Sequence, residues 1–172
     1  MNPSKQVQLL LSNLIFRGLT PVDAKALFGA GEVLSFRAGT TLFSQGEIAS
    51  SLCLVLAGAF QVQVVSTTDE TTTLATISPG EVVGEVAMLR AGKRSATLIA
   101  AVDSVVWKLP SDVFEGLLER GDPMAGRILH GMSHDLCRRF REVVYEGAAL
   151  MGRMAPKNTK KIYDDSLEWE LL

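Results

Sequence analysis

The spacing of hydrophobic and polar residues divides the chain into a central β-rich stretch flanked by helical ones. From Val33 to Leu109, short apolar or alternating runs are separated by glycine, which is typical of strands joined by tight turns. The glycines between these runs suit turns that need a positive φ or close packing. The pattern predicts strands over residues 52–56, 60–65, 72–77 and 96–106.

A short helix is predicted just before this stretch. Thr20 is a good N-cap, Pro21 suits the first helical position, and the charge of Asp23 favours the exposed N–H groups of a first turn. The helix should run to about Phe28 and end near Gly29 or Gly31.

Two further helices are predicted after Leu109. They cover residues 112–120 and residues 123 to about 150, with a break at 121–123 where glycine and proline occur. Apolar residues recur along the longer helix at three- and four-residue steps: Ile128, Leu129, Met132, Leu136, Phe140, Val143 and Val144. This face must be covered by the β-sheets, by a ligand or by a second copy of the helix.

Together these elements predict a mainly β protein, an antiparallel jelly-roll barrel with short N-terminal helices and a long C-terminal helix. We expect an N-terminal extension at residues 1–18, helical in part, a domain at 19–150 that includes the C-terminal helices, and a tail at 151–172. The tail is too short for a helix-turn-helix domain. It is either a flexible end or a short amphipathic segment that docks through Trp169.

Composition supports one globular domain and narrows its partners. Of the 172 residues 47% are hydrophobic and 21% are charged, and this hydrophobic fraction is enough to form a core. No apolar stretch approaches the roughly 20 residues that a membrane span requires. We therefore expect a cytoplasmic protein. The net charge of −2 gives no general attraction for nucleic acid. Cys53 and Cys137 lie in apolar patterns and are predicted to be packing residues.

The segment from Val83 to Leu89, with Arg94 shortly after it, has the residues needed to bind one phosphate. Gly84 lets the backbone approach an anion, the next residues form a helical turn with free N–H groups, and Arg94 supplies a charged fork. Glu85 would repel a phosphate unless it accepts a hydrogen bond from a neutral group such as a ribose hydroxyl. This combination favours a nucleotide with few negative charges.

Residues 84–87 and 94–97, at this spacing, resemble the phosphate-binding cassette of cyclic nucleotide-binding domains, the family of cyclic AMP receptor proteins and regulatory subunits of protein kinase A. Residues 38–47, 52–58 and 78–81 also resemble that family, in the family's order. The resemblance covers roughly residues 19 to 140.

The resemblance implies a role for each cassette residue. Arg94 would pair with the exocyclic phosphate oxygens and Glu85 would accept the ribose 2′-hydroxyl, while Ser95 and Ala96 would offer N–H groups. Lys93 stands where the family often has proline. The remaining cassette ligands implied are Gly84, Val86 and Ala87.

Further residues are implied around the base. Val62, Leu74 and Val83 would line the pocket, although plain core packing explains them nearly as well. Arg139, Phe140 and Val143 of the long helix would cover the base. We expect cyclic AMP rather than cyclic GMP as the ligand, only because cyclic AMP is the more frequent ligand in this family.

Other functions find less support. His130 and His134 lie four residues apart but lack the HExxH pattern and a third ligand, so we expect no bound metal. No nucleophile with a neighbouring base is recognisable, so we expect no catalysis. The arginines at 138, 139 and 141 are expected to form a solvated face rather than contact DNA.

The sequence predicts a stand-alone cyclic-nucleotide sensor that signals to a partner protein by movement of its C-terminal helix. A homodimer through that helix is worth testing. The alternative is a protein-interaction or dimerisation module that keeps the barrel without binding nucleotide.

Overall fold

The computed structural model describes residues 2–66, 68–89 and 92–154. Its helices are α1 (Pro3–Ser12), α2 (Pro21–Ala30), α3 (Val86–Leu89), α4 (Ser111–Glu119) and α5 (Pro123–Met154). Its strands are β1 (Glu32–Phe36), β2 (Thr41–Phe43), β3 (Ile48–Ala49), β4 (Ser51–Ala57), β5 (Phe60–Val65), β6 (Thr71–Ile77), β7 (Val82–Val83), β8 (Gly92–Lys93), β9 (Thr97–Ala100) and β10 (Ser104–Pro110). The chain divides into two compact units, residues 1–135 and residues 136–172, with the boundary within the sequence of α5, and each unit is described by itself.

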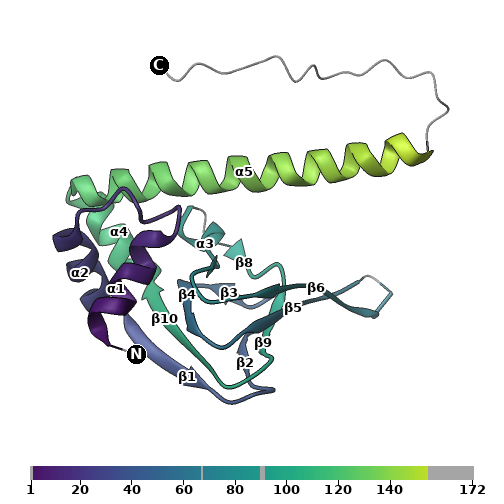
Figure 1. Ribbon diagram of the computed structural model, residues 1–172, viewed down its shortest axis with the longest axis horizontal. Coiled ribbons are helices and arrows are strands. Elements are labelled where there is room, and N and C mark those ends of the chain that lie inside the picture. The colour runs from purple at the N-terminus through teal and green to yellow at the C-terminus, as the bar shows by residue number, and fades with distance from the viewer. Residues whose placement is uncertain (1, 67, 90–91, 155–172) are drawn as a thin grey trace. The chain divides into compact units, whose positions relative to one another are not determined.

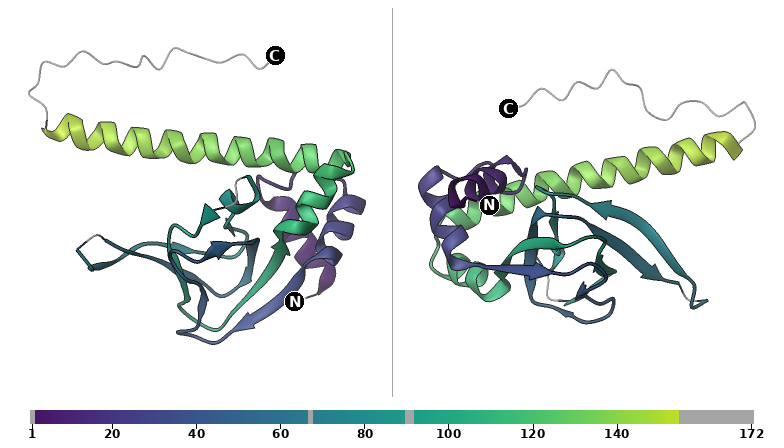
Figure 2. Two further views of the ribbon diagram at one scale, coloured as in Figure 1. Left: turned by 180° about the vertical axis from the view of Figure 1, so that it is seen from behind. Right: turned by 60° about the horizontal axis from the view of Figure 1, so that its bottom comes forward.

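The first unit is built on two four-stranded antiparallel sheets, shown in Figure 1. One has the order β1-β10-β4-β7 and the other β2-β9-β5-β6, while β3 and β8 form a separate two-stranded pair. The mainly β, jelly-roll fold class is confirmed. The described strands stay in separate sheets rather than closing into a barrel, and the β5–β6 hairpin extends beyond the rest of its sheet (Figure 2).

Strand β4 is buried on both faces, which explains its unbroken apolar sequence. Successive side chains of a strand point to opposite sides. Leu52, Leu54 and Leu56 therefore join the core beneath the helices, while Cys53 and Val55 join the core between the two sheets. The strand thus links the structural core of the helical end to the interior where the candidate site lies.

Helices α1, α2 and α4 gather at one end of the first unit (Figure 1). The predicted cap of α2 is present, since Thr20 Oγ1 accepts from Asp23 N at 3.1 Å, and the helix ends at Ala30 with Gly31 as its C-cap. Trp107 of β10 anchors this end: its indole N–H donates to Phe28 O at 2.9 Å and its ring stacks on Phe28. The N-terminal segment takes part too, because Leu10, Ile15 and Phe16 are fully buried in the same core.

The single apolar run predicted over residues 96–106 is two strands. Residues 101–103 are exposed and turn the chain from β9, in one sheet, to β10, in the other. Asp103 stabilises this turn region by accepting from Ala38 N at 2.9 Å through Oδ1. Periodicity alone misses the turn because Ala101 and Val102 are themselves apolar.

The apolar face predicted on α5 is divided between the two units. Ile128 and Met132 are fully buried in the first unit. In the second unit Phe140, Val143, Val144 and Tyr145 are exposed. Cys137 is exposed as well, so the prediction that it is a packing residue is wrong, whereas Cys53 is buried as predicted. No helix in the described part of the chain is long and apolar enough to cross a membrane.

Candidate ligand-binding site

The cassette begins where the short strand β7 leaves its sheet. Val83 pairs with Cys53 of β4, and the chain then turns at Gly84, which has a φ of +81°. Glu85 follows, buried at 5% exposure, and α3 comes next. Beyond α3 the chain returns through β8, which pairs with β3, and reaches Arg94.

Gly84 and Arg94 come into direct contact across the cassette. A Cβ at residue 84 would overlap Nη1 of Arg94 and lie 2.9 Å from Ser51 O. The positive φ also disfavours any side chain there. Glycine at this position therefore lets the guanidinium lie directly over the cassette backbone.

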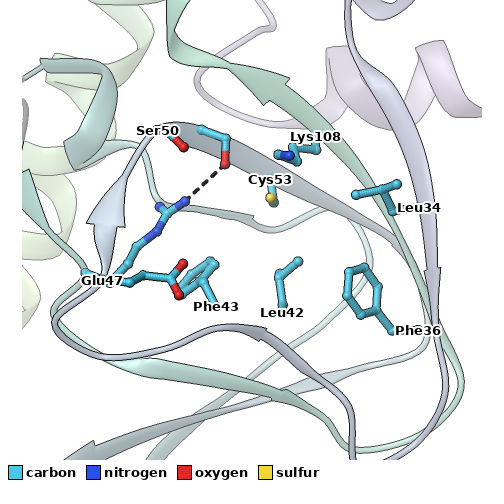
Figure 3. A pocket seen from close by; sticks show the side chains of 10 residues that line it. Leu34, Phe36, Leu42, Phe43, Glu47, Ser50, Cys53 and Lys108 are labelled. Carbon is cyan, nitrogen blue, oxygen red and sulfur yellow. Dashed lines mark hydrogen bonds between the residues drawn. The ribbon is translucent and has the colours of Figure 1, made fainter.

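Arg94 is a buried cation with unused hydrogen-bonding capacity. The residue is 7% exposed, and its Nη2 donates to Ser51 Oγ at 3.1 Å, the bond drawn in Figure 3. Its Nε and Nη1 have no hydrogen-bond partner among the described residues. Buried donors left unpaired are costly and rare in folded proteins. Their presence points to an anionic group that completes the site.

Acidic groups around Arg94 favour its charged form. Burial lowers the pKa of Arg94 below its usual value, and the effect is opposed by the negative charges of Cys53 in its thiolate form, Glu47 and Glu85. An arginine with these neighbours keeps its charge at neutral pH. Burial also raises the pKa of the Cys53 thiol to about 11, although the nearby charges of Arg94 and Lys108 act in the opposite direction. The thiol is therefore neutral beside the arginine.

The turn at residues 44–47 holds the backbone on either side of Arg94. Arg94 N donates to Glu47 O at 2.8 Å, and Gly46 N donates to Arg94 O at 2.9 Å. The Glu47 side chain stabilises the turn by accepting from Ser44 N at 2.9 Å. Gln45 joins it to β5, since its side chain bonds both N and O of Val65. Residues 44–47 thus support the cassette from outside it.

A cavity of about 160 Å³ lies beside the guanidinium, between the two sheets (Figure 3). Apolar side chains line its inner part and polar ones its other side: Leu34, Phe36, Leu42, Phe43, Cys53, Glu47, Ser50, Ser51, Arg94 and Lys108. The Arg94 side chain therefore lies between the cassette backbone and a partly open cavity.

The other predicted cassette residues are distributed around this centre. Ser95 is exposed and Ala96 buried, while Val86 is exposed on α3, which also carries Ala87. Of the predicted pocket lining, Val83 is buried and Val62 half-buried, and both belong to the core between the sheets. Leu74 is 63% exposed on β6, so it is not a core residue. The ligand contacts of these residues stay predictions.

The predicted base lid lies in the second unit. Phe140 and Val143 are 70% and 67% exposed and Arg139 is half-buried. Their role stays a prediction.

Arg94 contacts two residues that were not predicted, Ser51 and Phe43. Phe43 lies within the family-like segment 38–47, whereas nothing in the sequence signals Ser51.

The two histidines lie close together on α5, with ring centroids 4.6 Å apart, and both are exposed. Within the described ranges, no group of three His, Cys, Asp or Glu side chains could hold a metal ion.

Comparison with known proteins agrees with this geometry. Residues 33–121 match the family model described as Cyclic nucleotide-binding domain. The match covers both sheets and the whole cassette, and the chain belongs to this family. Its fold and cassette are thus those of a regulatory, cyclic-nucleotide-sensing module.

Individual relatives come from several kinds of protein. The cyclic AMP receptor protein of Thermus thermophilus is 29% identical over 132 residues, which are 77% of this chain and 59% of the relative. A lysophospholipase of Candida albicans is 37% identical over 117 residues, 64% of this chain but 8% of that enzyme. The chain therefore spans less than two thirds of these relatives.

Solved structures show the same fold. The Thermus thermophilus catabolite activator protein superposes with a TM-score of 0.71 at 27% identity, covering 81% of this chain and 63% of that one. A cyclic nucleotide-binding domain from Methylobacillus flagellatus gives a TM-score of 0.74 at 21% identity, covering 92% of this chain and 88% of that one.

Proposed function

We propose that this chain binds a cyclic mononucleotide, cyclic AMP in preference to cyclic GMP, without transforming it. The observation that carries the proposal is the buried Arg94 guanidinium, which lies over Gly84 with Nε and Nη1 unpartnered among the described residues. A cyclic phosphodiester has a single negative charge, which one arginine and nearby backbone N–H groups neutralise without a metal. The name of the Thermus thermophilus relative supports cyclic AMP as the ligand.

The energetics make this proposal easy to test. Removing the arginine from a buried ion pair costs about 2 to 5 kcal/mol, which is roughly 30- to several-thousand-fold in affinity. We expect calorimetric titration to give micromolar or tighter binding for the wild type and binding at least about 30-fold weaker for Arg94→Ala. Arg127→Ala is the matched control, because Arg127 pairs with Asp23 at an exposed site and should leave binding unchanged. Equal affinity of wild type and Arg94→Ala would contradict the proposal.

The output of binding is proposed to be a change in α5. The helix continues from the core of the first unit, where Ile128 and Met132 are buried, into the second unit, where apolar side chains are exposed. A ligand that binds one arrangement of the helix better shifts the population toward it. The same proposal includes a partner protein that binds the changed helix. It also includes the prediction that Arg139, Phe140 and Val143 cover the base.

Hydrogen exchange tests the output separately from binding. Saturating cyclic AMP should change amide exchange in residues 123–150 as well as in the cassette. If exchange changes in the cassette alone, the chain binds nucleotide but α5 carries no signal.

A second candidate function is protein interaction through α5, with or without nucleotide. The observation that favours it is the exposure of Phe140, Val143 and Val144, which are 70%, 67% and 42% exposed and share one face of the helix because they lie three and four residues apart. Exposed apolar clusters commonly mark protein interfaces. Sedimentation should then show a homodimer that Phe140→Glu dissociates. A wild type that sediments as a monomer at all concentrations would exclude self-association.

A further inference from the structure

Arg94 is held from two sides by residues outside the cassette. Ser51, at the start of β4, accepts from Nη2 at 3.1 Å, and Phe43 of β2 places its ring centroid 4.0 Å from Cζ. Both contacting residues are themselves buried, at 4% and 7% exposure. A free arginine side chain has many rotamers, and a cation over an aromatic face is favourable. These two contacts therefore select one position for the guanidinium.

The contacts leave two nitrogens of the guanidinium, Nε and Nη1, buried and without a hydrogen-bond partner among the described residues. Ser51 uses Nη2 and the Phe43 ring takes one face, whereas Nη1 lies against Gly84 and has no partner among the described residues, like Nε. An anion that displaces the cassette backbone from Nη1 does not compete with Ser51, because Ser51 uses Nη2. The arrangement is therefore preorganised rather than competitive with a ligand.

The partly open cavity beside Arg94 makes this selection necessary. Arg94 lines a space of about 160 Å³ that is also bordered by Leu42 and Cys53. Without Ser51 and Phe43, the guanidinium has room to turn into that space and away from Gly84. Lys108 also lines the cavity, but its Nζ pairs with Glu32 at 3.0 Å and does not fix the position of Arg94.

We infer that Ser51 and Phe43 are positioning residues that hold Arg94 over Gly84 and thereby set the affinity of the phosphate site. The inference rests on the proposed function for its binding readout. Its structural content, that these two side chains determine where the guanidinium lies, holds in the nucleotide-free protein as well.

Titration calorimetry with cyclic AMP measures the effect on binding. We expect Ser51→Ala to weaken binding by about 3- to 10-fold, the usual effect of one net hydrogen bond. Phe43→Leu, which keeps an apolar side chain but removes the aromatic face, should weaken it by a similar factor. Ser50→Ala is the matched control, because Ser50 is the adjacent serine and lines the same cavity but is exposed. It should change the affinity by less than about 2-fold.

A double-mutant cycle shows whether Ser51 acts through Arg94. Lysine cannot reproduce the planar fork, so Ser51→Ala should cause little further loss in an Arg94→Lys background. If Ser51→Ala weakens binding by the same factor in both backgrounds, Ser51 does not position Arg94 and the inference is overturned. Urea unfolding of each variant separates a loss of affinity from a loss of folded protein.

A readout without nucleotide keeps the two proposals apart. The NMR signal of the Arg94 side-chain Nε–H should be distinct and slow to exchange in the wild type, and averaged or fast to exchange in Ser51→Ala. That result, combined with no binding of cyclic AMP or cyclic GMP, would reject the proposed ligand but support the positioning role. Identical Nε–H signals in the two proteins would overturn the positioning role whether or not nucleotide binds.

Discussion

Nη1 of Arg94 occupies the space that a side chain at Gly84 would need. Gly84→Ala should therefore move the guanidinium as well as strain a backbone with a φ of +81°. We expect a loss of about 1 to 3 kcal/mol in the free energy of unfolding and a large loss of cyclic AMP affinity. Urea unfolding and calorimetry measure the two effects.

Gly39→Ala is the matched control for that substitution. Gly39 has nearly the same φ, +80°, but nothing lies within 4 Å of its Cβ position. Gly39→Ala should lower the free energy of unfolding through backbone strain but should not lower the affinity for cyclic AMP. Equal affinity losses in the two variants would mean that the contact with Arg94 is unimportant.

Glu85 is predicted to recognise the ribose rather than the phosphate. Glu85→Ala should weaken cyclic AMP binding by roughly 10- to 100-fold, because a hydrogen bond to a charged acceptor is lost. Binding of the 2′-deoxy analogue should be unaffected by the substitution, because that ligand lacks the donor. A similar loss for both ligands, in a variant that circular dichroism shows to be folded, would assign Glu85 a structural role instead.

Stability should fall at alkaline pH because of Cys53. Its pKa is raised from 9.0 to about 11 by burial, so the folded state retains a proton that the unfolded state releases between these values. The free energy of unfolding should decrease by about 2 to 3 kcal/mol as the pH rises from 9 to 11. Cys53→Ala should flatten this dependence in urea titrations while lowering stability at pH 7. An unchanged slope in Cys53→Ala would show that another group is responsible.

Trp107 should contribute far more to stability than an exposed ion pair. Trp107→Phe removes the bond to Phe28 O and part of the stacked ring in a fully buried position. We expect a loss of about 2 to 4 kcal/mol. Arg127→Ala breaks the exposed pair with Asp23 and should cost less than about 1 kcal/mol. Thermal unfolding followed by circular dichroism compares the two, and a similar cost for both would contradict this assignment of the core.

Local physical chemistry explains why much of the fold could be predicted from the sequence. Thr20, Pro21 and Asp23 begin α2 through contacts within a few residues, and β4 is recognisable because burial on both faces leaves no polar position to interrupt it. The cassette could be predicted for a similar reason, since a glycine, a glutamate and an arginine at this spacing have specific chemical uses. Each of these signals lies within a short segment.

The environment of Arg94 was decided by the tertiary structure. Phe43 and Ser51 are 51 and 43 residues away along the chain, and they meet Arg94 only because β2 and β4 belong to facing sheets. The exposure of Leu74 and the turn between β9 and β10 likewise depend on which strands pair. The sequence could not show either of them, because an apolar pattern is the same whether or not a neighbouring strand covers it. The sequence by itself therefore determined most of the elements and the family to which the cassette belongs, whereas its ligand contacts stay predictions. Long-range packing decided which side chains position the arginine, because contacts between distant segments leave no periodic signal in either segment.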